Sequence, residues 1–180
     1  MRLLSIPANP APEGAIAGTI ATPDGTTLRF ARWATPADGK GTVCVFTGRG
    51  EYIEKYFETV RDLRKRGYAV AVIDWRGQGH SSRRLDNPFK GHVQSFSDYE
   101  IDVAAFVKQV VLPDCPPPYF ALAHSMGGAV MLHVARAGTE VFERFVLCSP
   151  SVGGRVTISP GVSDSRTATR AVGAGFGKPG

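Results

Sequence analysis

The sequence predicts an α/β fold in which a β-hairpin precedes a mostly parallel sheet with helices on both faces. Two observations lead to this prediction. Short, continuous apolar segments, typical of strands buried on both faces, alternate with longer segments whose apolar residues recur at helical spacing. The chain has 180 residues, 43% of them hydrophobic, which is enough for one domain with a substantial core.

The expected strands are placed by their residue types. A hairpin is predicted from segments 15–21 and 26–33, because Pro23, Asp24 and Gly25 between them favour a turn. The other strands are rich in β-branched and apolar residues, as strands of a buried parallel sheet are. These four strands are expected at residues 42–46, 69–73, 119–123 and 145–148.

Two helices are expected in the connections between the first three of these parallel strands. The first begins near Ile53, and Gly67 is placed to end it. The second begins at a capping box formed by Ser97 and Glu100, and it ends near Pro113. The apolar stripes that predict these helices consist of Ile53, Tyr56, Phe57, Val60 and Leu63, and of Tyr99, Val103, Phe106, Val107 and Val110.

Composition and charge argue against several classes of protein. The net charge is +5, but the last thirty residues contribute more than half of it, and basic residues elsewhere are interspersed with acidic ones. A nucleic-acid-binding face needs clustered Lys and Arg, so no nucleic-acid partner is expected. The widely spaced Cys44, Cys115 and Cys148 favour reduced thiols in a cytoplasmic protein, two of them in the core on strands. No segment has the pattern of a signal peptide or a transmembrane helix.

Three regions are expected along the chain. Residues 1–13 are rich in Pro and Ala and are expected to be loose, and residues 14–150 form the domain. Residues 151–180 contain no leucine and show no helical or strand periodicity, so we expect a disordered tail that resembles a linker.

Segment 118–130 carries the strongest chemical signal. It predicts a strand, a sharp turn at Ser125 and a helix that runs to about residue 137. Such a turn presents the serine hydroxyl above the end of a sheet, where a histidine can deprotonate it and a carbonyl can reach it. The turn needs small residues two positions before and after the serine, which Ala123 and Gly127 supply, and Gly128 lets the helix lie close against the strand. The alternative is an ordinary strand-to-helix connection.

The loops after the expected parallel strands meet at one edge of the sheet, where folds of this kind bind ligands. Ser125 is therefore expected to face the same crevice as the glycine-rich loop at residues 47–50. Dinucleotide binding is the alternative for this loop and for loop 77–79, but neither completes the G-x-G-x-x-G pattern, and there is no P-loop. No cofactor and no metal are expected.

Three motifs together resemble the α/β-hydrolase superfamily, and within it the branch of lysophospholipases and monoacylglycerol lipases that is grouped with serine aminopeptidase S33-like hydrolases. Their order and spacing agree with this family over roughly residues 18–150. The motifs are Thr-Gly-Arg-Gly-Glu at residues 47–51, Asp-Trp-Arg-Gly-Gln-Gly-His-Ser at 74–81 and Ala-His-Ser-Met-Gly-Gly at 123–128.

The resemblance implies acyl transfer with Ser125 as the nucleophile. The backbone amides of Met126 and Arg49 would form the oxyanion hole. The implied substrate is a lipid ester such as a lysophospholipid or a monoacylglycerol, with peripheral membrane contact only through this substrate. We call the turn at Ser125 the elbow and the loop at residues 47–50 the oxyanion loop. The residues expected to shape and support them are Ala123, His124, Gly127, Gly128 and Gly48.

The family places its triad acid and histidine after the nucleophile, and this chain does not supply them. After Ser125 the only histidine is His133, roughly 12 Å along the serine's own helix, and the only aspartate is Asp164. We therefore hypothesise a truncated or frame-shifted hydrolase in which the C-terminal strands and the lid are missing after about residue 150. The strand at 145–148 would then lie at an exposed edge of the sheet.

Two alternatives remain beside a serine ester hydrolase of lysophospholipase type. The first is a catalytically incompetent fragment or pseudoenzyme that lacks the triad Asp and His. The second is a peptidase or small-ester hydrolase of the same superfamily. Related hydrolases of this fold that use an aspartate nucleophile are disfavoured, because Ser125 stands at the nucleophile position.

Overall fold

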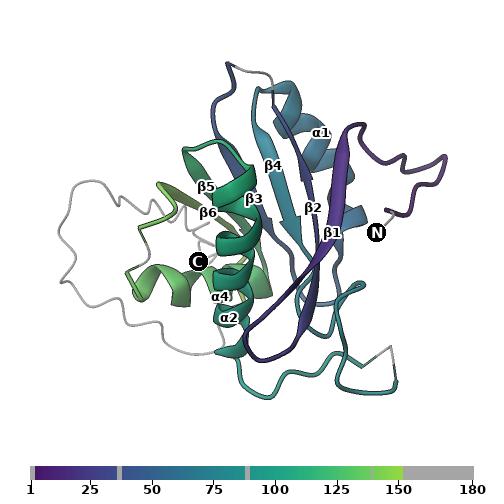
Figure 1. Cartoon of the computed structure of the whole chain (residues 1–180), viewed down its shortest axis with the longest axis vertical. Helices are drawn as coiled ribbons and strands as arrows, with labels where there is room; N and C mark the ends of the chain where they lie inside the picture. The colour runs from purple at the N-terminus through teal and green to yellow at the C-terminus, as the bar shows by residue number, and fades with distance from the viewer. Residues whose placement is uncertain (1–2, 36–37, 88–89, 139, 152–180) are drawn as a thin grey trace, which may run out of the picture.

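The computed structural model describes residues 3–35, 38–87, 90–138 and 140–151. These residues form a six-stranded sheet with the strand order β1-β2-β4-β3-β5-β6 (Figure 1). Each predicted strand is present, and its ends differ from the predicted ones by one residue at most. The strands are β1 (Ala15–Ala21), β2 (Thr27–Trp33), β3 (Thr42–Phe46), β4 (Ala69–Ile73), β5 (Tyr119–His124) and β6 (Arg144–Cys148).

Helices connect the parallel strands, and the predicted ones are present. The first is divided into a 3-10 turn, η1 (Ile53–Tyr56), and an α-helix, α1 (Phe57–Lys65). The second, α2 (Asp98–Phe106), continues through a π-helical turn, η2 (Val107–Val111), into a short last turn, α3 (Leu112–Asp114). The third, α4 (Met126–Arg136), begins directly after Ser125.

The sheet brings the carboxyl ends of its central strands level with one another. Strands β4, β3, β5 and β6 are parallel, whereas β1 and β2 form an antiparallel hairpin that pairs with β4. Phe46 at the end of β3 lies opposite Ile73 of β4 and Ala123 of β5. The loops that follow these three strands, including the turn at Ser125, therefore share one edge of the sheet.

Alternating side chains of β3 fill two separate cores. Cys44 and Phe46 belong to the core that contains α2 and α4, whereas Val43 and Val45 belong to the core that contains α1. Figure 1 shows the sheet between these helices. All residues of β3 and β4 are buried, because helices cover both faces. This explains why their sequences are continuously apolar rather than alternating.

A buried ion-pair network holds the loop after β4 against the hairpin. Arg29 is fully buried and donates through Nε to Asp74 Oδ2 at 2.6 Å and through its two terminal nitrogens to Glu54 at 2.8 and 2.7 Å. Asp74 also accepts the backbone N–H groups of Ile53 and His80, both at 2.9 Å. The loops after β3 and β4 are thereby fixed to β2.

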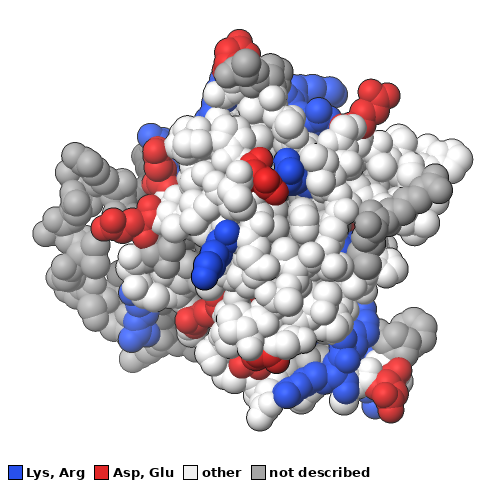
Figure 2. Space-filling view, in the orientation of Figure 1, with Lys and Arg blue, Asp and Glu red and all other residues white. Residues whose placement is uncertain are grey.

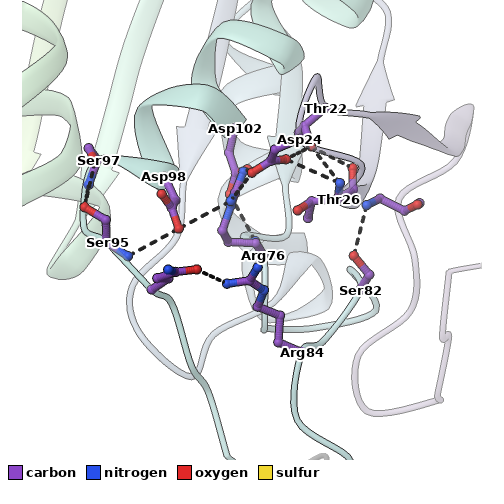
Figure 3. A network of polar contacts seen from close by, with 12 residues as sticks. Thr22, Asp24, Thr26, Arg76, Ser82, Arg84, Ser95, Ser97, Asp98 and Asp102 are labelled. Carbon is purple, nitrogen blue, oxygen red and sulfur yellow. Dashed lines mark hydrogen bonds and ion pairs between the residues drawn. The ribbon is translucent and has the colours of Figure 1, made fainter.

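A second network joins the hairpin turn, the loop after β4 and α2 (Figure 3). Arg76 donates to the buried Asp102 through its backbone N–H at 3.1 Å and through Nε at 2.8 Å. Its Nη1 donates to Asp24 at 2.7 Å and lies 3.6 Å from Asp98. The Thr22 hydroxyl also donates to Asp24. The carboxyl edge of the sheet is therefore anchored by two sets of charges.

Basic side chains are dispersed on the face that Figure 2 shows. Lys and Arg alternate there with Asp and Glu around a largely uncharged surface, and no continuous basic area spans this face. The charge distribution on this face agrees with the interspersed pattern of the sequence.

The predicted capping box at the start of α2 is wrong. Ser97 already has helical dihedral angles, and its side chain makes no capping hydrogen bond. Instead the Ser95 N–H donates to Asp98 Oδ2 at 3.3 Å, and the Ser97 N–H donates to Ser95 Oγ at 3.4 Å. The Glu100 carboxylate lies 3.6 Å from His133 Nδ1.

Strand β6 is more exposed than its apolar composition predicts, although an exposed edge at this strand is what the hypothesis of missing C-terminal strands leads one to expect. Its burial alternates along the strand, with Val146 54% exposed and Cys148 also exposed. The prediction that the strand cysteines are core residues therefore holds for Cys44 but is wrong for Cys148; the second buried thiol is Cys115. The physical reason is position, since β6 is the edge of the sheet formed by the described residues.

Residues 3–13, which are predicted to be loose, contact the domain. The Leu4 N–H donates to the Glu54 carboxylate at 3.2 Å, and the Asn9 side-chain amide donates to the Glu54 carbonyl at 2.8 Å. This segment therefore differs from the prediction, because it supplies hydrogen bonds to a buried glutamate. The predicted tail lies outside the described residues, except for Ser151.

Candidate active site

Ser125 occupies a sharp, strained turn between β5 and α4. Its φ of 51° and ψ of −115° place it in the left-handed half of backbone space, which costs a non-glycine residue about 1–3 kcal/mol. Three backbone hydrogen bonds hold this conformation: the Ser125 N–H donates to Cys148 O at 3.0 Å, and Ser125 O accepts the N–H groups of Ser151 at 3.0 Å and of Ala129 at 3.2 Å. The strand, turn and helix expected around Ser125 are therefore present.

Small residues around Ser125 allow α4 to approach the sheet. A Cβ atom on Gly127 would lie 2.4 Å from the carbonyl oxygen of Phe46. A Cβ on Gly128 would lie 2.8 Å from Pro150 Cβ, so this glycine makes room for the chain after β6 rather than for the strand before Ser125. Ala123 is fully buried under the turn.

One expected oxyanion donor, Met126, lies directly after Ser125, and the other, Arg49, lies in the loop after β3. Met126 is the first residue of α4, so its backbone N–H has no acceptor within the helix. Arg49 lies in the loop after β3, next to the fully buried Thr47. Among the hydrogen bonds of the described residues, none is donated by the backbone N–H of Met126 or Arg49. Both amides are therefore available to a developing oxyanion.

The Glu51 carboxylate braces the oxyanion loop against the elbow. One of its oxygens, Oε2, accepts the Gly48 N–H at 2.7 Å and the Tyr56 hydroxyl at 2.6 Å, and it lies 3.1 Å from His124 Nδ1. Burial raises the pKa of Glu51, but the contacts with Tyr56, His124 and Gly48 outweigh burial and hold the pKa below its ordinary value of 4.5. Burial and the nearby Glu51 carboxylate raise the pKa of Tyr56.

This brace explains two of the expected support residues. His124 precedes the nucleophile and reaches the brace with Nδ1, so it links β5 to the oxyanion loop. Gly48 leaves room for this brace, because a Cβ there would lie 2.7 Å from Glu51 Oε2 and 3.0 Å from His124 Nδ1 and would displace these two side chains. Glu51 belongs to the first sequence motif but has no role predicted from sequence, and its separation of 73 residues from His124 leaves no local signal of the contact.

Replacing Glu51 by glutamine is expected to destabilise the domain by about 1–2 kcal/mol at pH 7, because charged hydrogen bonds to Gly48 and Tyr56 are weakened. The lowered pKa of Glu51 means that this stabilisation is present above the pKa of an unfolded Glu and is lost as the pH falls through the lower folded value. Urea unfolding of both proteins between pH 7 and pH 3 measures the difference. If the difference in the free energy of unfolding between the two proteins stays constant over this range, the contribution of an ionised Glu51 carboxylate is contradicted.

The described residues place no histidine against the Ser125 hydroxyl. This hydroxyl lies 3.0 Å from Ser151 Oγ, which is its hydrogen-bond partner. His133 is exposed on α4 and packs beside Phe96. Asp164 lies outside the described residues. A histidine that could deprotonate Ser125 is therefore not among the side chains that the described part of the chain brings to this hydroxyl.

Neither a metal site nor a membrane span is found in the described part of the chain. Its residues contain no group of three or more His, Cys, Asp or Glu side chains arranged to hold a metal ion. None of its helices has the length and hydropathy of a membrane span.

A protein-family model described as serine aminopeptidase, S33, matches residues 37–173, more than half of the chain. The matched range passes residue 150 and so enters the segment for which the sequence predicts a tail outside the family. That tail stays a prediction, because its residues from 152 onward lie outside the described structure.

Curated relatives agree with this family match. The chain is 38% identical over 130 residues to lysophospholipase L2 of Escherichia coli strain K12 and 31% identical over 132 residues to the monoglyceride lipase of Mus musculus. Both matches cover 72% of this chain, but only 38% and 41% of the two relatives. The chain therefore spans less than half the length of the curated relatives it matches.

Solved structures show the same fold at low identity. The alpha/beta hydrolase domain-containing protein 10 from mouse matches with a TM-score of 0.58 at 18% identity, covering 73% of this chain and 48% of the mouse chain. At this identity the likeness shows the fold alone. The predicted fold class, the N-terminal part of an α/β-hydrolase domain, is confirmed.

Proposed function

Because this chain belongs to the serine aminopeptidase S33 family of α/β hydrolases, we propose that it is a serine ester hydrolase acting on lysophospholipids or monoacylglycerols. The observation that carries the proposal is the turn at Ser125, whose strained φ of 51° presents the hydroxyl at the carboxyl edge of the sheet. The names of the relatives supply the substrate class, since they are a lysophospholipase and a monoglyceride lipase.

In the proposed reaction, Ser125 Oγ attacks the ester carbonyl and its proton passes to a base. The backbone N–H groups of Met126 and Arg49 donate hydrogen bonds to the oxyanion, and the alcohol leaves to give an acyl-enzyme that water hydrolyses. Loss of one such donor typically costs on the order of 100-fold in rate. Glu51 acts as a positioning residue, because it holds the loop that carries the Arg49 amide.

The substrate class also bears on where the protein works. We infer a cytoplasmic protein that meets membranes only through its lipid substrate. This inference rests on three free thiols and on the lipid esters named for the relatives. A peptidase or small-ester hydrolase of the same family is a weaker candidate, because lysophospholipase L2 and monoglyceride lipase are both named for lipid substrates.

A second candidate function is that of a catalytically incompetent family member that keeps the elbow. One observation favours it: among the described residues the hydroxyl of Ser125 has Ser151 Oγ as its hydrogen-bond partner, and no histidine. The two candidates make opposite predictions about the reactivity of Ser125.

Labelling with a fluorophosphonate probe separates these candidates. If the proposal is correct, the purified chain becomes covalently labelled, and mass spectrometry of the digested protein locates the adduct on Ser125. The variant Ser125→Ala is then expected to lose labelling completely, whereas Ser97→Ala, a serine in the loop before α2, keeps it. A folded chain that stays unlabelled supports the second candidate, and an adduct on another serine would overturn the assignment of Ser125.

A further inference from the structure

A pocket of about 540 Å³ opens beside the oxyanion loop. It lies between the loop after β3 and the loop after β4, and its volume is in the range of small-molecule sites. Residues of the first loop that line it include Arg49 and Gly50. Residues of the second loop include Gln78, Gly79, His80 and Arg83. Because Arg49 also carries a proposed oxyanion amide, the pocket adjoins the proposed reaction centre.

Two arginine side chains line this pocket, and neither guanidinium is paired with a carboxylate of the described residues. Arg83 donates to the backbone carbonyls of Gly77 and Gly79, which fix its guanidinium but do not neutralise it. No ion pair of the described residues involves Arg49. The only carboxylate of the lining, Glu54, already accepts two hydrogen bonds from the buried Arg29. The charge of the lining therefore favours an anion.

Gln78 supplies an independent indication of a polar ligand. Its side chain is only 6% exposed, and its Oε1 accepts the Gly50 N–H. Its Nε2 is a buried donor without a hydrogen-bond partner among the described residues. Burying a donor of this kind without a partner is unfavourable. Because Gln78 lines the pocket, a ligand with hydrogen-bond acceptors there is the partner that this amide lacks.

Glycines form part of the wall of this pocket, so backbone atoms line it there. Gly79 has a φ of 51°, and a Cβ there would lie 2.0 Å from Asp74 Oδ2, so only glycine fits. The Gly50 φ of 71° likewise favours glycine. The pocket therefore combines backbone walls with two arginines, a combination suited to phosphate oxygens.

We propose that this pocket binds a phosphate group, and that in the proposed reaction the group is the phosphodiester of a lysophospholipid. This inference rests on the proposed function and deepens it. Arg49 and Arg83 would recognise the phosphate, and the ester carbonyl would lie at the neighbouring Ser125 turn. The site would thereby prefer phosphate-bearing monoacyl lipids over neutral monoacylglycerols.

Amide NMR of the 180-residue chain tests the proposal with three probes: glycerophosphocholine, inorganic phosphate and glycerol. We expect glycerophosphocholine to shift amide signals of residues 49–50 and 77–83 in a saturable manner, and glycerol to leave them unchanged. Arg49→Gln is expected to weaken the binding of glycerophosphocholine about tenfold or more, since charged hydrogen bonds contribute about 1.5–3 kcal/mol. Arg84→Gln removes the same charge from an exposed arginine outside the pocket and is expected to change this affinity less than about twofold, by analogy with screened surface charges.

Three outcomes would overturn the proposal. If glycerophosphocholine causes no saturable shifts, the chain has no such site. If Arg49→Gln and Arg84→Gln lose the same affinity for glycerophosphocholine, the binding is only a general electrostatic attraction. Binding of inorganic phosphate without glycerophosphocholine contradicts the assignment to a lipid phosphodiester. The titration does not depend on a reactive serine, so it is repeated in Ser125→Ala. Binding that persists there while the wild-type chain resists fluorophosphonate contradicts the proposed hydrolase activity but leaves the phosphate site in place.

Discussion

Replacing Arg29 by methionine is expected to destabilise the domain by about 3–5 kcal/mol, a large part of the stability of an ordinary domain. The Arg29 guanidinium is fully buried and binds two buried carboxylates, those of Asp74 and Glu54. Methionine has a similar length and keeps the apolar packing of the side chain, but it leaves two carboxylates in the interior with only backbone N–H partners and no cation. Their desolvation is then uncompensated, which is the physical origin of the loss.

Urea or thermal unfolding followed by circular dichroism measures this effect. The matched control is Arg61→Met, which removes a half-buried arginine whose guanidinium donates to the Pro10 carbonyl instead of to a buried carboxylate. We expect the control to change the free energy of unfolding by less than about 1 kcal/mol. A loss in Arg29→Met no larger than in the control would show that the buried carboxylates do not need this cation.

Replacing Gly127 by alanine is expected to destabilise the domain by about 2–3 kcal/mol, although alanine favours helices. The added Cβ would lie 2.4 Å from Phe46 O and 2.6 Å from Thr47 O. Both obstacles are backbone atoms at the start of the oxyanion loop, so the loop or α4 must move. If the chain is reactive, labelling of Ser125 is expected to fall on the order of 100-fold, because the oxyanion donors lose their alignment.

The control for this steric effect is Gly138→Ala at the end of α4. Gly138 has a φ of 79°, but no atom lies within 4 Å of an added Cβ. We expect a loss of about 1 kcal/mol from backbone strain alone and no change in the labelling of Ser125. Chemical denaturation and probe labelling of both variants provide the comparison. Equal effects in the two variants would contradict a role for close contact between α4 and β3.

The elements that sequence predicts best are those whose local pattern and tertiary environment agree. β3 and β4 are continuously apolar because helices cover both faces, and both strands lie where the pattern places them. β6 has a similar composition but alternates in exposure, because it lies at the sheet edge of the described residues. The composition of a strand indicates that its side chains can be buried. It does not indicate which other elements cover the strand.

The charged contacts of the site could not be predicted in the same way. Arg29 meets Glu54 and Asp74 across 25 and 45 residues, and Glu51 meets His124 across 73. Each of these charged residues could equally lie on a solvated surface. No periodicity or spacing in the sequence therefore indicates which of them pair. The turn at Ser125 was predictable because strand, small residues and helix are contiguous there.

The anchoring of Ser125 to the chain at and after β6 has a consequence for local stability. The Ser125 N–H is bonded to Cys148 O, and the Ser125 carbonyl accepts hydrogen bonds from the Ser151 N–H and from the Ala129 N–H of α4. Segments at the edge of a fold open with smaller free energies than the core, in cooperative units smaller than the whole domain. Opening of β6 would therefore remove two of these three hydrogen bonds, whereas the bond to α4 would stay. The strained turn at Ser125 then loses part of its support while the two cores stay folded, so the persistence of its geometry depends on an edge strand of the described sheet.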